Sequence, residues 1–234
     1  MIIVKIPFSE GSLNKNKGTE LAPNKLTKSK NQIKIIKNNT DLTYRNIEQA
    51  KGDLFIGGDH SITYPLFKSF SKKHKNPGLI ILDAHPDAEV YTKTPTHEDF
   101  VRKLIDEKFL KQQNLTYIGL RNISKNEKQF LKKITWFKSK DKFEKIKQYL
   151  EKINLSCDAL YLSIDTDVLD SKYYTATGYP EPKGLTPNQL FKLLKYIKTL
   201  KIKKIDIVEY NPTLDKNKEI NLIKKIIKIL HYSK

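Results

Sequence analysis

The sequence predicts an α/β fold built around a largely parallel sheet. Short apolar runs typical of strands alternate with amphipathic runs typical of helices. Residues of chemical interest directly follow several apolar runs, as ligand-binding residues do at the carboxyl ends of strands in an open α/β sheet. The 234 residues, 38% of them hydrophobic, suffice for one core, and neither a repeat nor a shift in composition divides them. We therefore expect a single domain over residues 1–234.

Eight strands and seven helices are expected along the chain. The strand-type runs are residues 2–6, 32–36, 53–56, 79–82, 115–118, 134–137, 159–163 and 204–208. The helix-type runs are residues 42–50, 62–73, 100–109, 125–132, 141–153, 187–200 and 219–230. The sixth helix has a well-defined start, with Thr186 as N-cap and Pro187 at the first helical position. The polar residues 8–30, rich in Lys and Asn, are expected to form a loop.

The composition argues against several classes of protein. The formal net charge is +18, but only Arg45, Arg102 and Arg121 are arginines, and the lysines are scattered over every segment. Nucleic-acid-binding surfaces favour arginine, so we expect a solvated lysine-rich surface and no nucleic-acid partner. No apolar run is long enough for a membrane span, and the apolar N-terminus is too short for a signal peptide. With Cys157 as the only cysteine, no internal disulfide can form, and a cytoplasmic location is the expectation.

The residues after two of the apolar runs are typical metal ligands. Asp83, His85 and Asp87 leave one predicted strand at alternate positions, and Asp165 and Asp167 leave another in the same way. A buried carboxylate needs a partner, and a metal ion is the strongest partner available. Taken singly, an Asp after a strand is usually a turn residue or a helix cap. Their conjunction at several strand ends instead predicts a metal site.

A further histidine completes the set of ligands. His60 follows another strand-type run, within the sequence Gly57-Gly58-Asp59-His60. Carboxylate and imidazole ligands without thiolates suit Mn²⁺, with Fe, Ni and Zn as the other options. Six side chains exceed the needs of one typical site but fit two metal ions when carboxylates bridge them. The sequence therefore predicts a binuclear centre.

At these residues the chain resembles the ureohydrolase (arginase/agmatinase) family, and agmatinases most closely. The shared motifs are residues 57–61 (GGDHS), 83–87 (DAHPD), 163–167 (SIDTD), 177–186 (TGYPEPKGLT) and 209–212 (EYNP). The resemblance covers roughly residues 53–212. It implies a three-layer α-β-α fold with a mainly parallel eight-stranded sheet, and two Mn²⁺ ions as cofactors.

The resemblance also implies how the metal ions are held. One ion would take His60, Asp83, Asp87 and Asp165, and the other Asp83, His85, Asp165 and Asp167. Asp83 and Asp165 would bridge the two ions. The pair of metals would make hydroxide available near neutral pH. The hydroxide would attack the carbon of a guanidinium, and the products would be urea and an amine.

Catalytic roles outside metal binding follow from the same resemblance. Glu209 would pair with the substrate guanidinium, and His97 would shuttle a proton to the leaving amine. Asp87 is counted with them as a catalytic residue. The alternative for Glu209 is a surface acid at a strand end. For His97 it is a residue that only lines its loop, because Glu98 stands where the family often has glycine.

Agmatine is the substrate that the loop before His97 favours. Nine residues separate Asp87 from His97, which is the spacing typical of agmatinases. Glu89 occupies the position of an arginase asparagine that holds the α-carboxylate, and a carboxylate there would repel that group. Glu181, in the agmatinase-like sequence that follows Tyr179, is expected beside Glu89 at the pocket mouth. We therefore expect a small cationic guanidino compound rather than arginine.

Other functions remain open at this point. One is an arginase or another guanidino- or formimino-acid hydrolase of the same family, whose anionic substrate would need a basic residue at the mouth, with Arg102, Arg121 and Lys93 as candidates. Another is a non-catalytic, metal-stabilised binding protein. The resemblance also leaves a homo-oligomer open.

Overall fold

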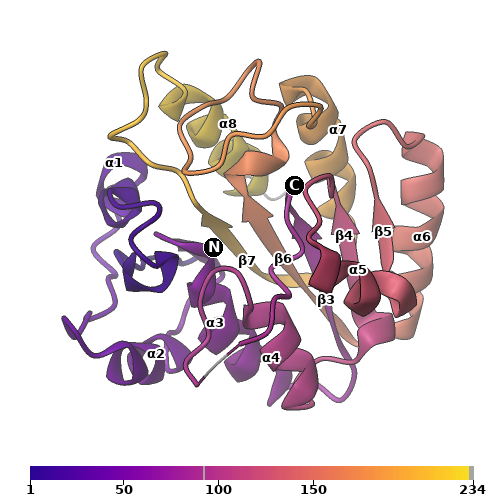
Figure 1. Ribbon diagram of the computed structural model, residues 1–234, viewed down its shortest axis with the longest axis horizontal. Helices are drawn as coiled ribbons and strands as arrows, with labels where there is room; N and C mark the ends of the chain where they lie inside the picture. Colours follow the sequence, from indigo (N-terminus) through magenta and orange to yellow (C-terminus); the bar gives the residue numbers. More distant parts are fainter. Residues whose placement is uncertain (92, 232–234) are drawn as a thin grey trace.

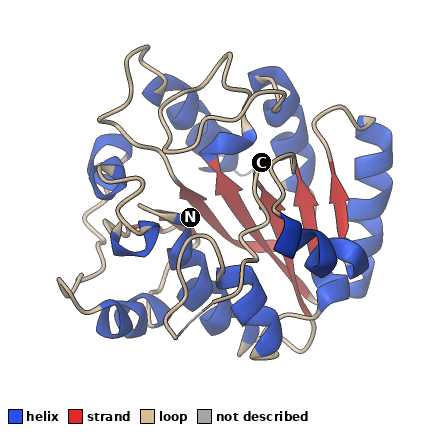
Figure 2. Ribbon diagram, viewed as in Figure 1, coloured by secondary structure: helices blue, strands red, loops and turns tan. Residues whose placement is uncertain are grey.

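A seven-stranded parallel sheet forms the centre of the protein in the computed structural model, which describes residues 1–91 and 93–231 (Figures 1 and 2). The strands are β1 (Ile3–Lys5), β2 (Leu54–Ile56), β3 (Pro77–Leu82), β4 (Leu115–Ile118), β5 (Thr135–Phe137), β6 (Ala159–Asp165) and β7 (Ile202–Val208). Their order in the sheet is β1-β2-β7-β6-β3-β4-β5, and each neighbouring pair is parallel.

The expected eighth strand, residues 32–36, is absent. Only Gln32 pairs, through an isolated parallel bridge to Lys5. Beyond Lys5 the partner strand ends, and Pro7 has no backbone N–H with which to extend a ladder. The alternating apolar residues Ile33 and Ile35 pack partly against the core without continuing the sheet. The prediction of a strand was therefore wrong, because a strand also needs a partner edge.

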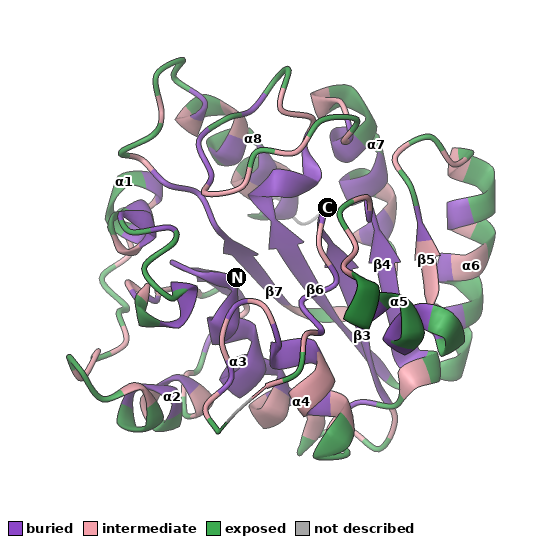
Figure 3. Cartoon of the chain, in the orientation of Figure 1, coloured by how far each residue is buried: buried purple, intermediate pink, exposed green. Residues whose placement is uncertain are grey.

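Helices cover both faces of the sheet. They are α1 (Ala22–Leu26), α2 (Thr40–Glu48), α3 (Thr63–Ser71), α4 (Phe100–Asp106), α5 (Lys125–Phe130), α6 (Phe143–Ser156), α7 (Pro187–Ile197) and α8 (Ile220–His231). Buried residues of α1, α6, α7 and α8 share one apolar cluster, and those of α2, α3, α4 and α5 share another. The buried sheet lies between these layers, and the exposed residues of the helices face outward (Figure 3). The three-layer α/β prediction is confirmed.

The central strand β3 shows why the sheet is buried on both sides. All six of its residues are buried. Ile80 and Leu82 belong to the first cluster, and Leu79 and Ile81 to the second, because alternate side chains point to opposite faces. A run of consecutive apolar residues is the expected pattern for a parallel strand covered on both faces.

The segment of residues 8–30 was expected to be a loop, and this prediction was wrong in part. It contains two 3₁₀ turns (Glu10–Ser12 and Thr19–Leu21) and the short helix α1. Ala22 and Leu26 of α1 are buried in the first cluster. These few apolar residues hold the segment against the core. Because their neighbours in the sequence are polar, the helix was not predicted.

The path of the chain places a crevice at the carboxyl ends of the strands. Strands β2 and β3 follow one another in sequence, but β7 and β6 lie between them in the sheet. Open α/β sheets bind ligands where the strand order reverses in this way. The arrowheads that are visible in Figure 2 lie toward the same edge of the sheet. Within the described residues, no helix is long and apolar enough to cross a membrane.

Candidate metal centre and active site

Four neighbouring strands carry the predicted site residues at their carboxyl ends. Asp83 follows β3, Asp165 ends β6, Glu209 follows β7, and the turn that leads to His60 follows β2. That turn requires glycine at position 58, because a Cβ atom there would lie 1.8 Å from the carbonyl oxygen of Phe8. The parallel strands thus deliver residues that are far apart in the sequence to one edge of the sheet.

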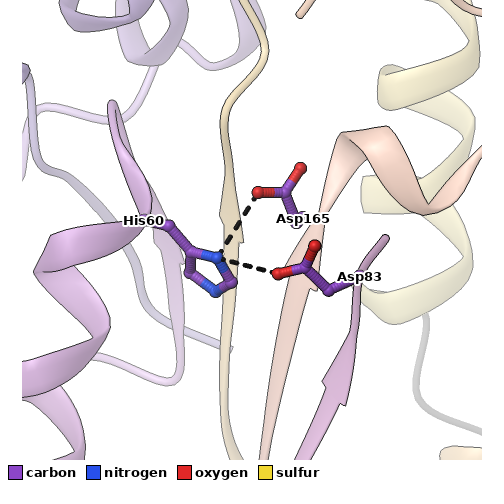
Figure 4. A group of neighbouring side chains, drawn as sticks. All are labelled: His60, Asp83 and Asp165. Carbon is purple, nitrogen blue, oxygen red and sulfur yellow. Dashed lines mark ion pairs between the residues drawn. The ribbon is translucent and has the colours of Figure 1, made fainter. Parts of the chain in front are cut away.

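The first group of ligands surrounds His60. Its Nδ1 atom lies 2.8 Å from Asp87 Oδ2, 3.2 Å from Asp83 Oδ2 and 3.4 Å from Asp165 Oδ2. Figure 4 shows the imidazole pointing at the carboxylates of Asp83 and Asp165. His60, Asp83 and Asp165 are close enough together to hold one metal ion.

The second group shares Asp83 with the first. His85 Nδ1 lies 2.9 Å from Asp167 Oδ2 and 3.6 Å from Asp83 Oδ1. Asp83 therefore turns one carboxylate oxygen to each histidine, as a bridging ligand would. Asp165 lies in the first group only, and its Oδ1 accepts a hydrogen bond from the backbone N–H of Asp167. Its bridging role stays a prediction.

The buried charges of this cluster fit a divalent cation. Within the described part of the chain, His60 Nδ1 and Asp83 Oδ2 have no hydrogen bond of good geometry, although both are buried and lie near one another. Burial and the charge of Asp83 raise the pKa of Asp87 to about 7. Burial, followed by the charges of Asp167 and Asp83, raises the pKa of Asp165 well above its usual range. Crowded carboxylates that must hold protons are the arrangement that a metal ion relieves.

Glu209 is held by three parts of the chain. The backbone N–H of His60 donates to its Oε1 at 2.7 Å, and Asn16 Nδ2 donates to its Oε2 at 2.5 Å. His97 Nδ1 lies 3.6 Å from Oε1. Burial opposes ionisation, but His97, Asn16 and the His60 N–H together lower the pKa of Glu209, so its carboxylate is charged at neutral pH.

His97 lies beside Glu209 on a loop that the N-terminal segment supports. Its backbone N–H donates to the carbonyl oxygen of Gly11 at 3.1 Å, and its side chain is buried. Although burial lowers the pKa of His97, the nearby carboxylate of Glu209 raises it to about 9. The imidazole therefore carries a proton at pH 7 that it can donate.

A cavity of about 310 Å³ opens over these residues. It is lined by His60, His85, Asp87, Glu89, His97, Glu98, Asn122, Ser124, Glu127, Asp165, Asp167, Thr177, Tyr179 and Glu209. Seven of these described residues are acidic and none is Lys or Arg, in a chain whose net charge is +18. The cavity therefore attracts cations, although the protein as a whole is basic.

The two substrate-binding acids predicted at the mouth are placed differently. Glu89 lines the cavity. Glu181 is not among the lining residues. Its Oε1 accepts a hydrogen bond from Asn122 Nδ2 at 2.7 Å and lies 3.7 Å from His85 Nε2. Glu181 thus stands next to a predicted metal ligand, beside two residues that line the cavity, and its role in substrate binding stays a prediction.

The basic residues considered for an anionic substrate are used elsewhere. Within the described residues, Arg121 donates to backbone carbonyl oxygens, among them those of Asp167 at 2.6 Å and Glu181 at 3.0 Å. Arg102 Nε donates to the carbonyl oxygens of Ala88 and Glu89, and its guanidinium lies over a phenyl ring. Lys93 is exposed and does not line the cavity.

Two residues of the site were not foreseen from the sequence. Asn16 reaches Glu209 from the segment that was expected to be a loop. The ring of Tyr179 lies between two histidines, with its centroid 6.0 Å from that of His85 and 6.1 Å from that of His97. Nothing in the sequence distinguished Asn16 as a site residue, because it stands among many similar Lys and Asn residues. The only indication for Tyr179 was its position inside the motif of residues 177–186.

Comparisons with known proteins agree with this geometry. The model of the arginase family matches residues 30–231. The chain is 31% identical over 176 residues to the mitochondrial guanidino acid hydrolase of Homo sapiens, covering 69% of this chain and 49% of that protein. It is 31% identical over 178 residues to the mitochondrial agmatinase of Gallus gallus, covering 69% of this chain and 50% of that protein. The chain thus spans about half the length of these curated relatives.

The fold is also shared with solved structures. The formimidoylglutamase from Bacillus subtilis superposes with a TM-score of 0.89 at 22% sequence identity. The match covers 98% of this chain and 85% of that one.

Proposed function

Because this chain belongs to the arginase family, we propose that it is a binuclear metal hydrolase that cleaves a guanidino group to urea and an amine, with agmatine as its preferred substrate. The observation that carries this proposal is the acidic cavity, which has no Lys or Arg among its described lining residues. Agmatine is a cation at both ends, and seven of the described residues that line the cavity are acidic.

The metal ligands are proposed as the sequence predicted them. His60, Asp83, Asp87 and Asp165 would hold one divalent ion, and Asp83, His85, Asp165 and Asp167 the other. Oxygen and imidazole ligands favour Mn²⁺ but admit other divalent metals. When bound, such a pair lowers the pKa of water and neutralises developing negative charge.

The protein's own residues would orient the substrate and supply the proton. The charged carboxylate of Glu209 would pair with the guanidinium and fix its carbon beside the metal centre. Water adds to that carbon, and the bond from carbon to the alkyl nitrogen breaks. The departing nitrogen needs a proton, which His97 can donate because its pKa is raised to about 9. Urea and a protonated amine, which for agmatine is putrescine, leave the site.

Arginine and guanidino acids fit the cavity less well. Both carry a carboxylate. Arg102 and Arg121 donate to backbone carbonyls, and Lys93 does not line the cavity. The ammonium group of Lys15 is paired with Glu98. At the proposed mouth, Glu89 would repel the substrate carboxylate. An unpaired like-charge contact in a cleft costs several kcal/mol, so we expect agmatine to exceed arginine by about 10²-fold in kcat/KM.

The test is hydrolysis of four substrates by one Mn²⁺-loaded preparation. Agmatine, arginine, 4-guanidinobutyrate and formiminoglutamate are compared by urea or formamide release. A preference for arginine or for an acid would contradict the agmatine assignment and leave the hydrolase proposal standing. A protein that binds two metals and cleaves none of these would support a non-catalytic binding protein. We further propose a cytoplasmic location.

A further inference from the structure

Asp206 is a fully buried carboxylate in β7, and among the described residues its side chain accepts hydrogen bonds from hydroxyl groups. Its flanking residues Ile205 and Ile207 belong to the apolar cluster on the other face of the sheet. Three hydroxyl groups satisfy it: Tyr161 at 2.7 Å, Thr63 at 2.9 Å and Ser163 at 2.6 Å. Burying a carboxylate among neutral donors is costly, so its presence calls for a purpose beyond packing.

One of the three hydroxyl groups links Asp206 to the metal centre. Ser163 Oγ lies 2.9 Å from His60 Nε2, and His60 Nδ1 faces the cluster of carboxylates. The hydroxyl has one hydrogen. If Asp206 receives it, the Ser163 oxygen is left to accept a hydrogen bond from Nε2–H. His60 then carries its hydrogen on Nε2 and presents the lone pair of Nδ1 to the cluster, as metal binding requires.

The sheet fixes this chain of hydrogen bonds. Ser163 on β6 is paired in register with Asp206 on β7, and Tyr161 stands on the same face as Ser163 two residues earlier. The relay therefore rests on two central strands rather than on a loop. A ligand oriented by such a scaffold loses little conformational entropy when it binds a metal ion.

We propose that Asp206, acting through Ser163, is a positioning residue that fixes the tautomer and ring orientation of His60 and so strengthens the metal site at that histidine. The inference rests on the proposed metal centre but not on the identity of the substrate. Outer partners of ligating histidines commonly change metal affinity by about 10–100-fold. The effect should be confined to the site of His60, because Asp206 has no such link to His85.

The test compares two variants that each remove one hydroxyl group from Asp206. Ser163→Ala breaks the chain of hydrogen bonds from Asp206 to His60. Tyr161→Phe also removes a hydroxyl that donates to Asp206, but this hydroxyl does not contact His60. Mn²⁺ binding is measured by calorimetry. We expect Ser163→Ala to weaken one of the two sites by about 10–100-fold and to leave the other within about threefold. Tyr161→Phe should leave both affinities near those of the wild-type protein, even if it lowers thermal stability.

A second measurement reports the tautomer directly. In ¹⁵N-histidine spectra of the Zn²⁺-loaded protein, His60 should show a protected Nε2–H that Ser163→Ala exposes to exchange. Should Ser163→Ala not fold, the nearly isosteric Asp206→Asn is used, and weaker binding at the same single site is expected. Wild-type affinity at both sites in a folded relay variant would overturn the proposal, as would equal weakening of both sites by Ser163→Ala and Tyr161→Phe. Selective weakening in a protein that cleaves no guanidine would uphold it while the proposed function fails.

Discussion

The two sides of the cavity are built from different kinds of structure. The metal side places Asp83, Asp165 and their neighbours at the ends of adjacent central strands. The substrate side places His97 and Glu209 against the N-terminal segment, through Gly11 and Asn16. On the metal side, one carboxylate is proposed to bind both metal ions, so a single substitution there should remove several metal contacts at once. Loop contacts are separate, so changes on the substrate side should have graded effects.

Asp165→Ala should have the largest effect. Asp165 lies 3.4 Å from His60 Nδ1, and its other oxygen accepts from the N–H of Asp167. We expect loss of both metal ions and of all activity, because the proposed bridge supports both sites. Metal analysis after dialysis measures this. Two ions retained by the variant would show that Asp165 is not shared between the sites.

His97→Asn should lower kcat by about 10²-fold and leave two metal ions bound. His97 lies on the substrate side, and its proton is the one proposed for the leaving amine. Steady-state kinetics with metal analysis of the same sample separates the two effects. Wild-type turnover would mean that His97 only lines its loop.

The pH dependence of metal binding concerns the metal side alone. The pKa of Asp87 is raised to about 7 by burial and by Asp83, so below that pH a cation must displace its proton. Because the pKa of Asp165 is raised as well, Mn²⁺ affinity should fall by at least about tenfold for each unit below pH 7. Calorimetry at pH 6, 7 and 8 measures this, and an affinity independent of pH would contradict it.

Stability of the metal-free protein should have the opposite trend. A carboxyl group whose pKa is raised on folding binds its proton more tightly in the folded state. Its stabilising contribution is full below the pKa of the unfolded chain, about 4, and is lost as the pH rises through about 7. Thermal unfolding with a chelator present should show lower stability at pH 8 than at pH 5.

Asn16→Ala should have the smallest effect. It tests the hydrogen bond by which the N-terminal segment holds Glu209 on the substrate side. It removes one donor from Glu209, which keeps the His60 N–H and the neighbouring His97. Losing a hydrogen bond to a charged carboxylate, worth about 1.5 kcal/mol, corresponds to about a tenfold rise in KM. Metal content should not change, and Lys17→Ala, an exposed change in the same segment, serves as the control. Loss of metal from the Asn16→Ala variant would contradict the inference that the substrate side and the metal side act separately.

Some expectations about the fold and the site required tertiary information. Residues 32–36 have the alternation of a strand, but the short edge strand β1 gives them a single bridge. Glu181 was expected to bind substrate, but its motif did not indicate that Asn122 would hold it beside His85. Sequence spacing does not report such partners, because each comes from a remote part of the chain.

The sequence by itself determined the α/β class, most of the elements and the six proposed metal ligands. It could do so because each signal is local: apolar runs define buried strands, and the residues that follow them lie at one edge of a parallel sheet. Only the tertiary structure decided which strands are neighbours, and hence that Asp206 reaches His60 through Ser163 and that Asn16 supports Glu209. These contacts join residues more than 40 positions apart and depend on strand order and packing, which no local pattern records.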